Sequence, residues 1–169
     1  MNFIQIPDLE SLGEFYMMPE LPMIEFKKDK IRYSVTDIRL LNQVGINVLE
    51  TILNEIAEDP DDETVTFSRE GVNDSAVNIV RDIVMGIRYK IEKKGRNGYF
   101  GQGTFLVSAV DITDTKMTFH LLKDHVGIVH DYIQSRKDKD ENVNFYALVV
   151  EVADRSIESL IKHDKADRE

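Results

Sequence analysis

The sequence predicts an α+β fold in which a mixed or largely antiparallel sheet of about five to seven strands packs against three long helices. Three apolar stripes recur at helical spacing, and several short segments alternate apolar with polar residues. An α/β sandwich with helices on both faces of the sheet is the alternative. Because the 169 residues contain no internal repeat and no linker-like stretch, we expect a single globular domain over residues 1–169, with residues 163–169 as a frayed tail.

The longest predicted helix covers residues 73–94. Its apolar stripe recurs every three or four residues and consists of Ala76, Val80, Ile83, Val84, Ile87 and Ile91. Asn73 supplies a capping oxygen at the start, and Gly95 suits the left-handed position that ends many helices. The negative pole of the helix dipole stabilises cations near the C-terminal end, where this segment carries Lys90, Lys93 and Lys94.

Two further stripes predict helices over residues 38–56 and 122–135, and Asp154 or Ser156 is expected to cap a short last helix. Gly45 lies inside the first of these stripes. A missing side chain at this position would let another element approach the helix closely.

Short β-prone or alternating segments predict the strands, which are residues 2–6, 21–26, 31–35, 64–67, 105–112, 117–121 and 143–152. The first is expected at a sheet edge. Polar turns predict two hairpins, one that pairs the second strand with the third and one that pairs residues 105–112 with 117–121. The apolar run in residues 143–152 is typical of a central strand buried on both faces.

The composition favours some classes of function and excludes others. Lys and Arg total 21 and Asp and Glu total 31, which gives a formal net charge of -10, so general nucleic-acid binding and membrane binding are not expected. There is no cysteine, which excludes disulfides, cysteine-ligated metals and a thiol nucleophile. No segment indicates a signal peptide or a membrane span, and we expect a cytoplasmic protein.

The Gly-rich stretch 95–103 is the first candidate site. It carries the candidate partner- or ligand-binding residues Lys94, Arg96, Asn97, Tyr99, Phe100 and Gln102. Exposed amides beside cations could wrap an anion, but a phosphate-binding loop needs the order strand, loop, helix, and this stretch follows a predicted helix and precedes a strand. We therefore interpret it as a helix cap followed by a turn or bulge, whose aromatic residues could contact a protein partner.

An acidic connection is the second candidate site, with the acidic-patch residues Asp59, Asp61, Asp62 and Glu63. It lacks the ligand pattern of an EF-hand calcium loop, so we interpret it as a solvated charge run that could attract a basic partner. His120, His125 and His130 lack metal-ligand spacing, and no GxSxG motif occurs. We expect no metal site and no cofactor, and no residue is assigned as catalytic.

The absence of catalytic signatures favours a binding role over an enzymatic one. We expect a small acidic protein-binding factor (an inhibitor, immunity or assembly protein) that occupies the surface of a protein partner, which could itself be basic. One alternative is a nucleotide-like anion-binding or catalytic domain that uses the Gly-rich stretch. A structural subunit of a larger assembly is the other, and homo-oligomerisation is left open.

Overall fold

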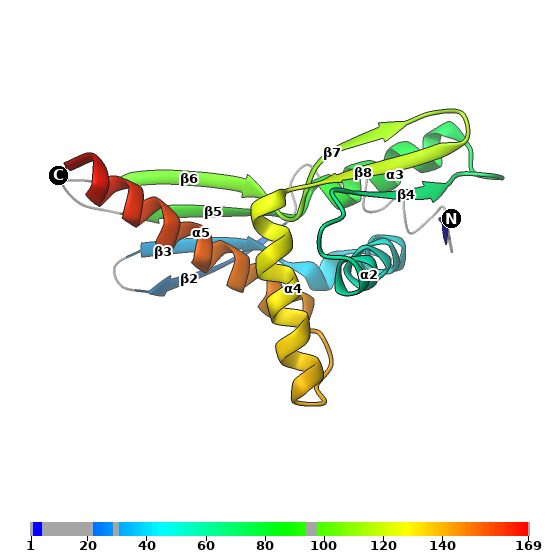
Figure 1. Ribbon diagram of the computed structural model, residues 1–169. Coiled ribbons are helices and arrows are strands. Elements are labelled where there is room, and N and C mark those ends of the chain that lie inside the picture. Colours follow the sequence, from blue (N-terminus) through cyan, green and yellow to red (C-terminus); the bar gives the residue numbers. More distant parts are fainter. Residues whose placement is uncertain (1, 5–21, 29–30, 94–97, 169) are drawn as a thin grey trace.

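A computed structural model describes residues 2–4, 22–28, 31–93 and 98–168 and confirms the α+β class. The strands form two four-stranded sheets rather than the single sheet expected from the sequence, and four α-helices pack against them (Figure 1). The two sheets are joined through the link between β6 and β7.

The first sheet is antiparallel, in the order β2 (Met23–Lys28), β3 (Ile31–Thr36), β5 (Arg88–Lys93) and β6 (Tyr99–Thr104). The predicted hairpin of β2 with β3 is confirmed. Alternation buries one face of β3 through Ile31, Tyr33 and Val35. Phe26 of β2 stacks on Tyr33 with ring centroids 4.7 Å apart, on the same inner face.

The second sheet has the order β1 (Asn2–Phe3), β4 (Thr64–Ser68), β8 (Lys116–Leu121) and β7 (Val107–Ile112). The predicted hairpin of β7 with β8 is confirmed, and β1 lies at the edge, parallel to β4. Phe67 and Phe119 meet edge to face in its core, with ring centroids 5.3 Å apart. β7 lies at the other edge of this sheet, and its residues Ser108 and Ala109 are exposed.

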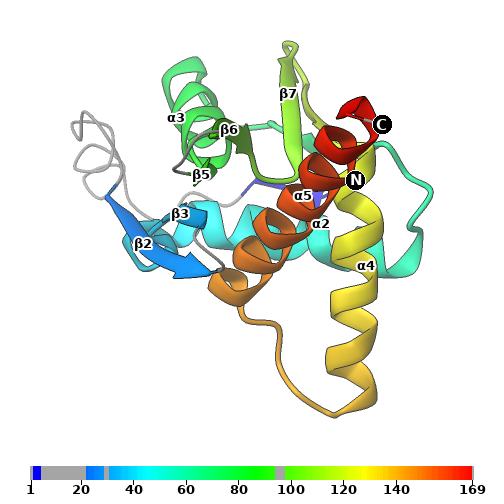
Figure 2. The same cartoon turned by 90° about the vertical axis from the view of Figure 1, so that its left-hand side faces the viewer.

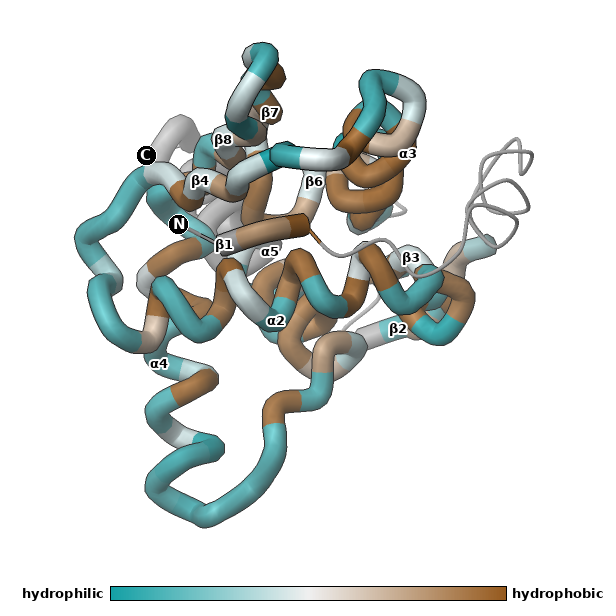
Figure 3. Tube along the Cα trace, turned by 90° about the vertical axis from the view of Figure 1, so that its right-hand side faces the viewer, coloured by the Kyte–Doolittle hydropathy of each residue, from teal (hydrophilic) through white to brown (hydrophobic). Residues whose placement is uncertain are grey.

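The helices comprise a 3-10 turn η1 (Ile38–Leu40), α2 (Gln43–Glu58), α3 (Asp74–Met85), α4 (Lys123–Asp138) and α5 (Phe145–Arg168). Figure 2 shows α5 crossing in front of α2 with α4 beside it, and α5 packs against β3 and β5. Figure 3 colours the far end of α4 and the connection to α5 hydrophilic, as expected for a segment that projects from the sheets. The expected helix 38–56 is divided, because Asp37 caps η1 and Asn42 caps α2.

The predicted helix over residues 73–94 is wrong in its second half. Asn73 caps α3 as expected, but the helix ends at Met85 and Gly86 closes it with its N–H on carbonyls of the last turn. Residues 88–93 then pair with both β3 and β6. Ile87 and Ile91 are four residues apart, which suits a helix, yet together with Tyr89 they also alternate as a strand does. Lys90 and Lys93 consequently lie in β5 and not at a helix end.

The predicted central strand 143–152 is also wrong, because this segment begins α5. Asn144 accepts a hydrogen bond from the N–H of Ala147 at 2.9 Å, which starts the helix well before the expected caps at Asp154 or Ser156. The fully buried residues recur with helical spacing: Leu148, Val149, Val152 and Ala153. Its continuous apolar run suggested a strand, but the burial pattern is that of a helix face.

Candidate interaction surface

The Gly-rich stretch forms the strand β6 over most of its described length, and the expected turn is corrected accordingly. Gly101 pairs with Ile91 and Gly103 pairs with Tyr89, so both glycines lie on the inner face of the sheet. A Cβ atom on Gly103 would come within 2.8 Å of the Tyr89 hydroxyl oxygen. The Gly103 position is therefore explained by packing, since the tyrosine ring fills the space beside the glycine.

The predicted site residues of this stretch divide into three groups. Lys94, Arg96 and Asn97 lie outside the described residues, and Tyr99 is described by its backbone alone. Phe100 is 63 % exposed, and Gln102 is exposed on the strand position opposite Lys90. The register of β5 with β6 places Phe100 and Gln102 on one face, which points away from the core.

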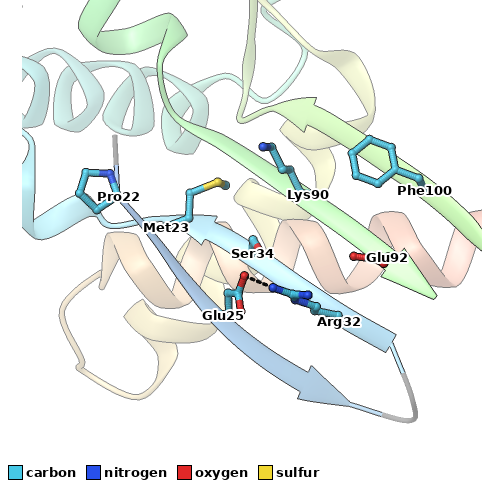
Figure 4. Close-up of a pocket in the computed structure, with 8 residues that line it drawn as sticks. All are labelled: Pro22, Met23, Glu25, Arg32, Ser34, Lys90, Glu92 and Phe100. Carbon is cyan, nitrogen blue, oxygen red and sulfur yellow. Dashed lines mark hydrogen bonds and ion pairs between the residues drawn. The ribbon is translucent and has the colours of Figure 1, made fainter. Parts of the chain in front are cut away.

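This outward face contains a hollow of about 560 Å³. Figure 4 shows it at the surface of the sheet, between the start of β2 and the ring of Phe100. Its lining residues come from β2, β3, β5, β6 and the residue before β2, and they are Pro22, Met23, Glu25, Arg32, Ser34, Lys90, Glu92 and Phe100. Of these, only Phe100 was a candidate from the sequence.

An ion pair across β2 and β3 lies in the lining of the hollow. The guanidinium of Arg32 donates to the Glu25 carboxylate, and this hydrogen bond raises the pKa of Arg32. Lys90 and Glu92 stand on the next strand, β5, and Phe100 lies opposite Glu92 on β6. The floor thus carries charged groups of both signs beside a large apolar ring.

The local charge of this face differs from that of the whole chain. Its described cations are Lys27, Arg32, Arg88 and Lys90, and its described anions are Glu25 and Glu92. Four cations less two anions gives +2, against -10 for the chain. The average charge of the sequence therefore hides a locally cationic face. Arg32 and Ser34 alternate with the buried residues of β3, and the strand register places this outward pair beside Lys90 of β5.

A second hollow, of about 500 Å³, lies on the inner side of the same sheet, toward α4 and α5. His125 of α4 lines it and is buried there, and its Nδ1 accepts a hydrogen bond from the Leu106 N–H at 2.9 Å. Burial lowers the pKa of His125, and the negative charge of Asp124 raises it by a smaller amount. The Tyr89 hydroxyl, also in this lining, donates to Ser156 Oγ at 3.3 Å. His125 and Tyr89 thus form hydrogen bonds within the protein, and these bonds stabilise the fold.

The acidic connection lies between α2 and β4, and Asp59, Asp61, Asp62 and Glu63 are all exposed. Asp59 accepts a hydrogen bond from the Asp61 N–H at 3.2 Å, and Glu63 lies 3.8 Å from Lys123 Nζ. The four carboxylates do not share a pocket with the Phe100 face. Among the described residues, no three acidic or histidine side chains are grouped as metal ligands are.

Comparisons with protein-family models, curated proteins and solved structures find no match for this chain. Within the described part of the chain, every helix is too short or too polar to cross a bilayer.

Proposed function

We propose that this protein acts by binding a protein partner, as an inhibitor, immunity or assembly factor, through the outward face of the β2-β3-β5-β6 sheet. The observation that carries the proposal is Phe100, a large aromatic side chain exposed beside a hollow lined by charged groups. A partner that covers this ring gains hydrophobic free energy, and aromatic residues and arginine dominate the binding energy of many protein interfaces.

The charged groups around Phe100 supply specificity. Glu25, Arg32, Lys90 and Glu92 line the same hollow, so a partner must meet both signs of charge in a fixed arrangement. A surface of this kind suits a partner with a complementary polar rim around an apolar contact. The exposed acidic connection is a separate surface, and a basic region of the same partner could contact it.

Site-specific photo-crosslinking tests the proposal. A photoreactive residue replaces Phe100 in one variant and Phe3 in a matched control, because Phe3 is 60 % exposed on the other sheet. We expect one protein of the source cells to be crosslinked from position 100 and not from position 3. The recombinant form of that protein should then bind Phe100→Ala at least about tenfold more weakly than wild type, and Phe3→Ala with unchanged affinity. Equal affinities of the two alanine variants, or no adduct from position 100, would overturn the proposal.

Anion binding is the second candidate function, because the outward face of the β2-β3-β5-β6 sheet carries more cations than anions. The amides of Gly101 and Gly103 face β5 in the strand register, so phosphates would instead meet Arg32 and Lys90. A thermal-shift screen with nucleotides checks this. Ligand at a hundredfold its dissociation constant adds about 2.7 kcal/mol to the free energy of unfolding, and Arg32→Ala should abolish that gain.

A further inference from the structure

Among the strands that the structure describes, β6 pairs on one side only, with β5. A strand at the edge of a sheet presents a row of N–H and C=O groups without strand partners, and natural proteins protect such edges with charges, proline, bulges or short length. The two sheets have four border strands, which are β1, β7, β2 and β6.

Three of these borders carry a recognised protection. β1 has two residues. β2 carries Glu25, Lys27 and Lys28. β7 has an irregular register between Val107 and Ala109 and carries Asp111. Each of the three therefore resists pairing with a further strand.

β6 carries none of these protections. Its six residues, Tyr99–Thr104, include no charged residue and no proline, and all six pair with β5 in unbroken register. It forms one border of its sheet (Figure 1). This border is therefore the one whose sequence and geometry suit an added strand.

The hydrogen-bond pattern identifies the outward backbone groups. The Phe105 N–H donates to the Ile87 carbonyl at 2.9 Å, just beyond the last β5-β6 pair. On the other side of β5, the N–H and C=O of Arg88 both bond to Thr36 Oγ1 at 2.9 Å. Antiparallel pairs alternate between bonded and non-bonded. The backbone groups of Phe100, Gln102 and Thr104, which lie opposite Glu92, Lys90 and Arg88, therefore point away from β5.

We propose that an extended segment of the protein partner adds to β6 as a fifth strand, with an apolar side chain packed on Phe100. This inference rests on the proposed function and specifies how the partner is held. Backbone hydrogen bonds to Phe100, Gln102 and Thr104 give affinity, and alternate side chains give specificity. A partner segment fits better than a second copy of this chain, because two copies of net charge -10 repel each other.

Two substitutions of Gln102 distinguish the contribution of its backbone N–H to binding from that of its side chain. Gln102→Pro removes one outward N–H while the bonds of β6 to β5 remain, because proline is tolerated where the N–H faces solvent. Gln102→Thr is the matched control, since it changes the side chain and keeps the N–H. Circular dichroism and the unfolding midpoint establish that both variants fold.

The probes are peptides selected on the immobilised wild-type chain from a displayed random-peptide library. We expect Gln102→Pro to bind them at least about tenfold more weakly than Gln102→Thr, because both variants lose the glutamine side chain but only the proline variant loses the N–H. Bound peptide should also slow hydrogen exchange at the amides of Phe100, Gln102 and Thr104. No selected peptide, equal binding by the two Gln102 variants, or protection at other amides would overturn strand addition.

The outcomes also distinguish the two proposals. If Phe100→Ala no longer binds the partner found by crosslinking and Gln102→Pro still binds it, the proposed partner face is supported and strand addition is overturned. If both variants bind this partner as wild type does, both proposals are overturned. Light scattering tests for a second copy of the chain at β6. If wild type is a dimer and Gln102→Pro is a monomer, a second copy occupies β6 and the proposal of a partner segment is overturned.

Discussion

Leu106 has a backbone conformation that is uncommon for a side chain of its size. Its φ is 65°, and the Val107 N–H donates to the Phe105 carbonyl across it at 2.7 Å, which makes a γ-turn between β6 and β7. Two contacts hold the turn. His125 Nδ1 accepts from the Leu106 N–H, and the Leu106 carbonyl accepts from the Leu122 N–H at 2.6 Å. One histidine thus helps to fix the joint between the two sheets.

We expect this histidine to make stability depend on pH. Burial lowers the pKa of His125 in the folded chain, so the unfolded chain binds the proton at higher pH. The stabilisation is complete above the ordinary histidine pKa of about 6.5 and is lost as pH falls through the lowered folded pKa. Asp124, Arg155 and Tyr89 line the same hollow, and of these Asp124 opposes the shift.

Urea unfolding at a series of pH values, with wild type compared to His125→Phe, measures the effect. At neutral pH the variant leaves the Leu106 N–H without its acceptor and should lose about 1–3 kcal/mol. The difference between the two proteins should shrink as pH falls below about 6. A constant difference between wild type and His125→Phe would contradict the prediction.

At the scale of elements, α2 and α3 meet at Gly45. A Cβ atom there would lie 2.4 Å from Ile83 Cγ2, so the missing side chain lets the two helices approach each other closely. The sequence predicted this close approach, because Gly45 interrupts an otherwise apolar stripe. It did not identify the partner helix.

Gly45→Ala should therefore destabilise the protein by about 1–3 kcal/mol, because Ile83 must move within a packed core. Gly127→Ala is the matched control. Gly127 also lies in a helix, its added Cβ would meet open space, and alanine has the higher helix propensity, so this variant should gain about 0.5–1 kcal/mol. Thermal unfolding of the two variants checks both signs. A neutral or stabilising Gly45→Ala would show that the helices separate at little cost.

At the scale of the whole molecule, one continuous core connects the two sheets. Tyr33 and Ile91 of the first sheet belong to the same buried cluster as Phe67 and Phe119 of the second. A shared core favours cooperative unfolding, because neither sheet keeps its apolar face covered when the other opens.

We expect the two sheets to unfold in one transition. The chain has no tryptophan, so Phe26→Trp in β2 and Val110→Trp in β7 each give a fluorescence signal from one sheet. Their urea midpoints should coincide with the midpoint from circular dichroism of the same variant. Separate midpoints within one variant would show that the sheets unfold independently and would contradict the single-domain expectation.

The candidate surface was only partly predictable. Phe100 and Gln102 were identified from the Gly-rich stretch, because aromatic and polar residues between glycines are conspicuous in a sequence. Glu25 and Arg32 were not identified, since each looks like an ordinary solvated residue of its own strand. They join Phe100 only because β2, β3, β5 and β6 are neighbours in the sheet.

The sequence by itself determined the α+β class, both hairpins and the N-cap of α3 at Asn73, because turn chemistry, caps and alternation act through neighbouring residues. Only the tertiary structure decided the end of α3, the helical state of residues 145–153 and the division into two sheets. Apolar residues four apart, such as Ile87 and Ile91, suit a helix and a strand alike. Pairing with β3 and β6 selects the strand there, and packing of Leu148 and Val152 into the core selects the helix in α5.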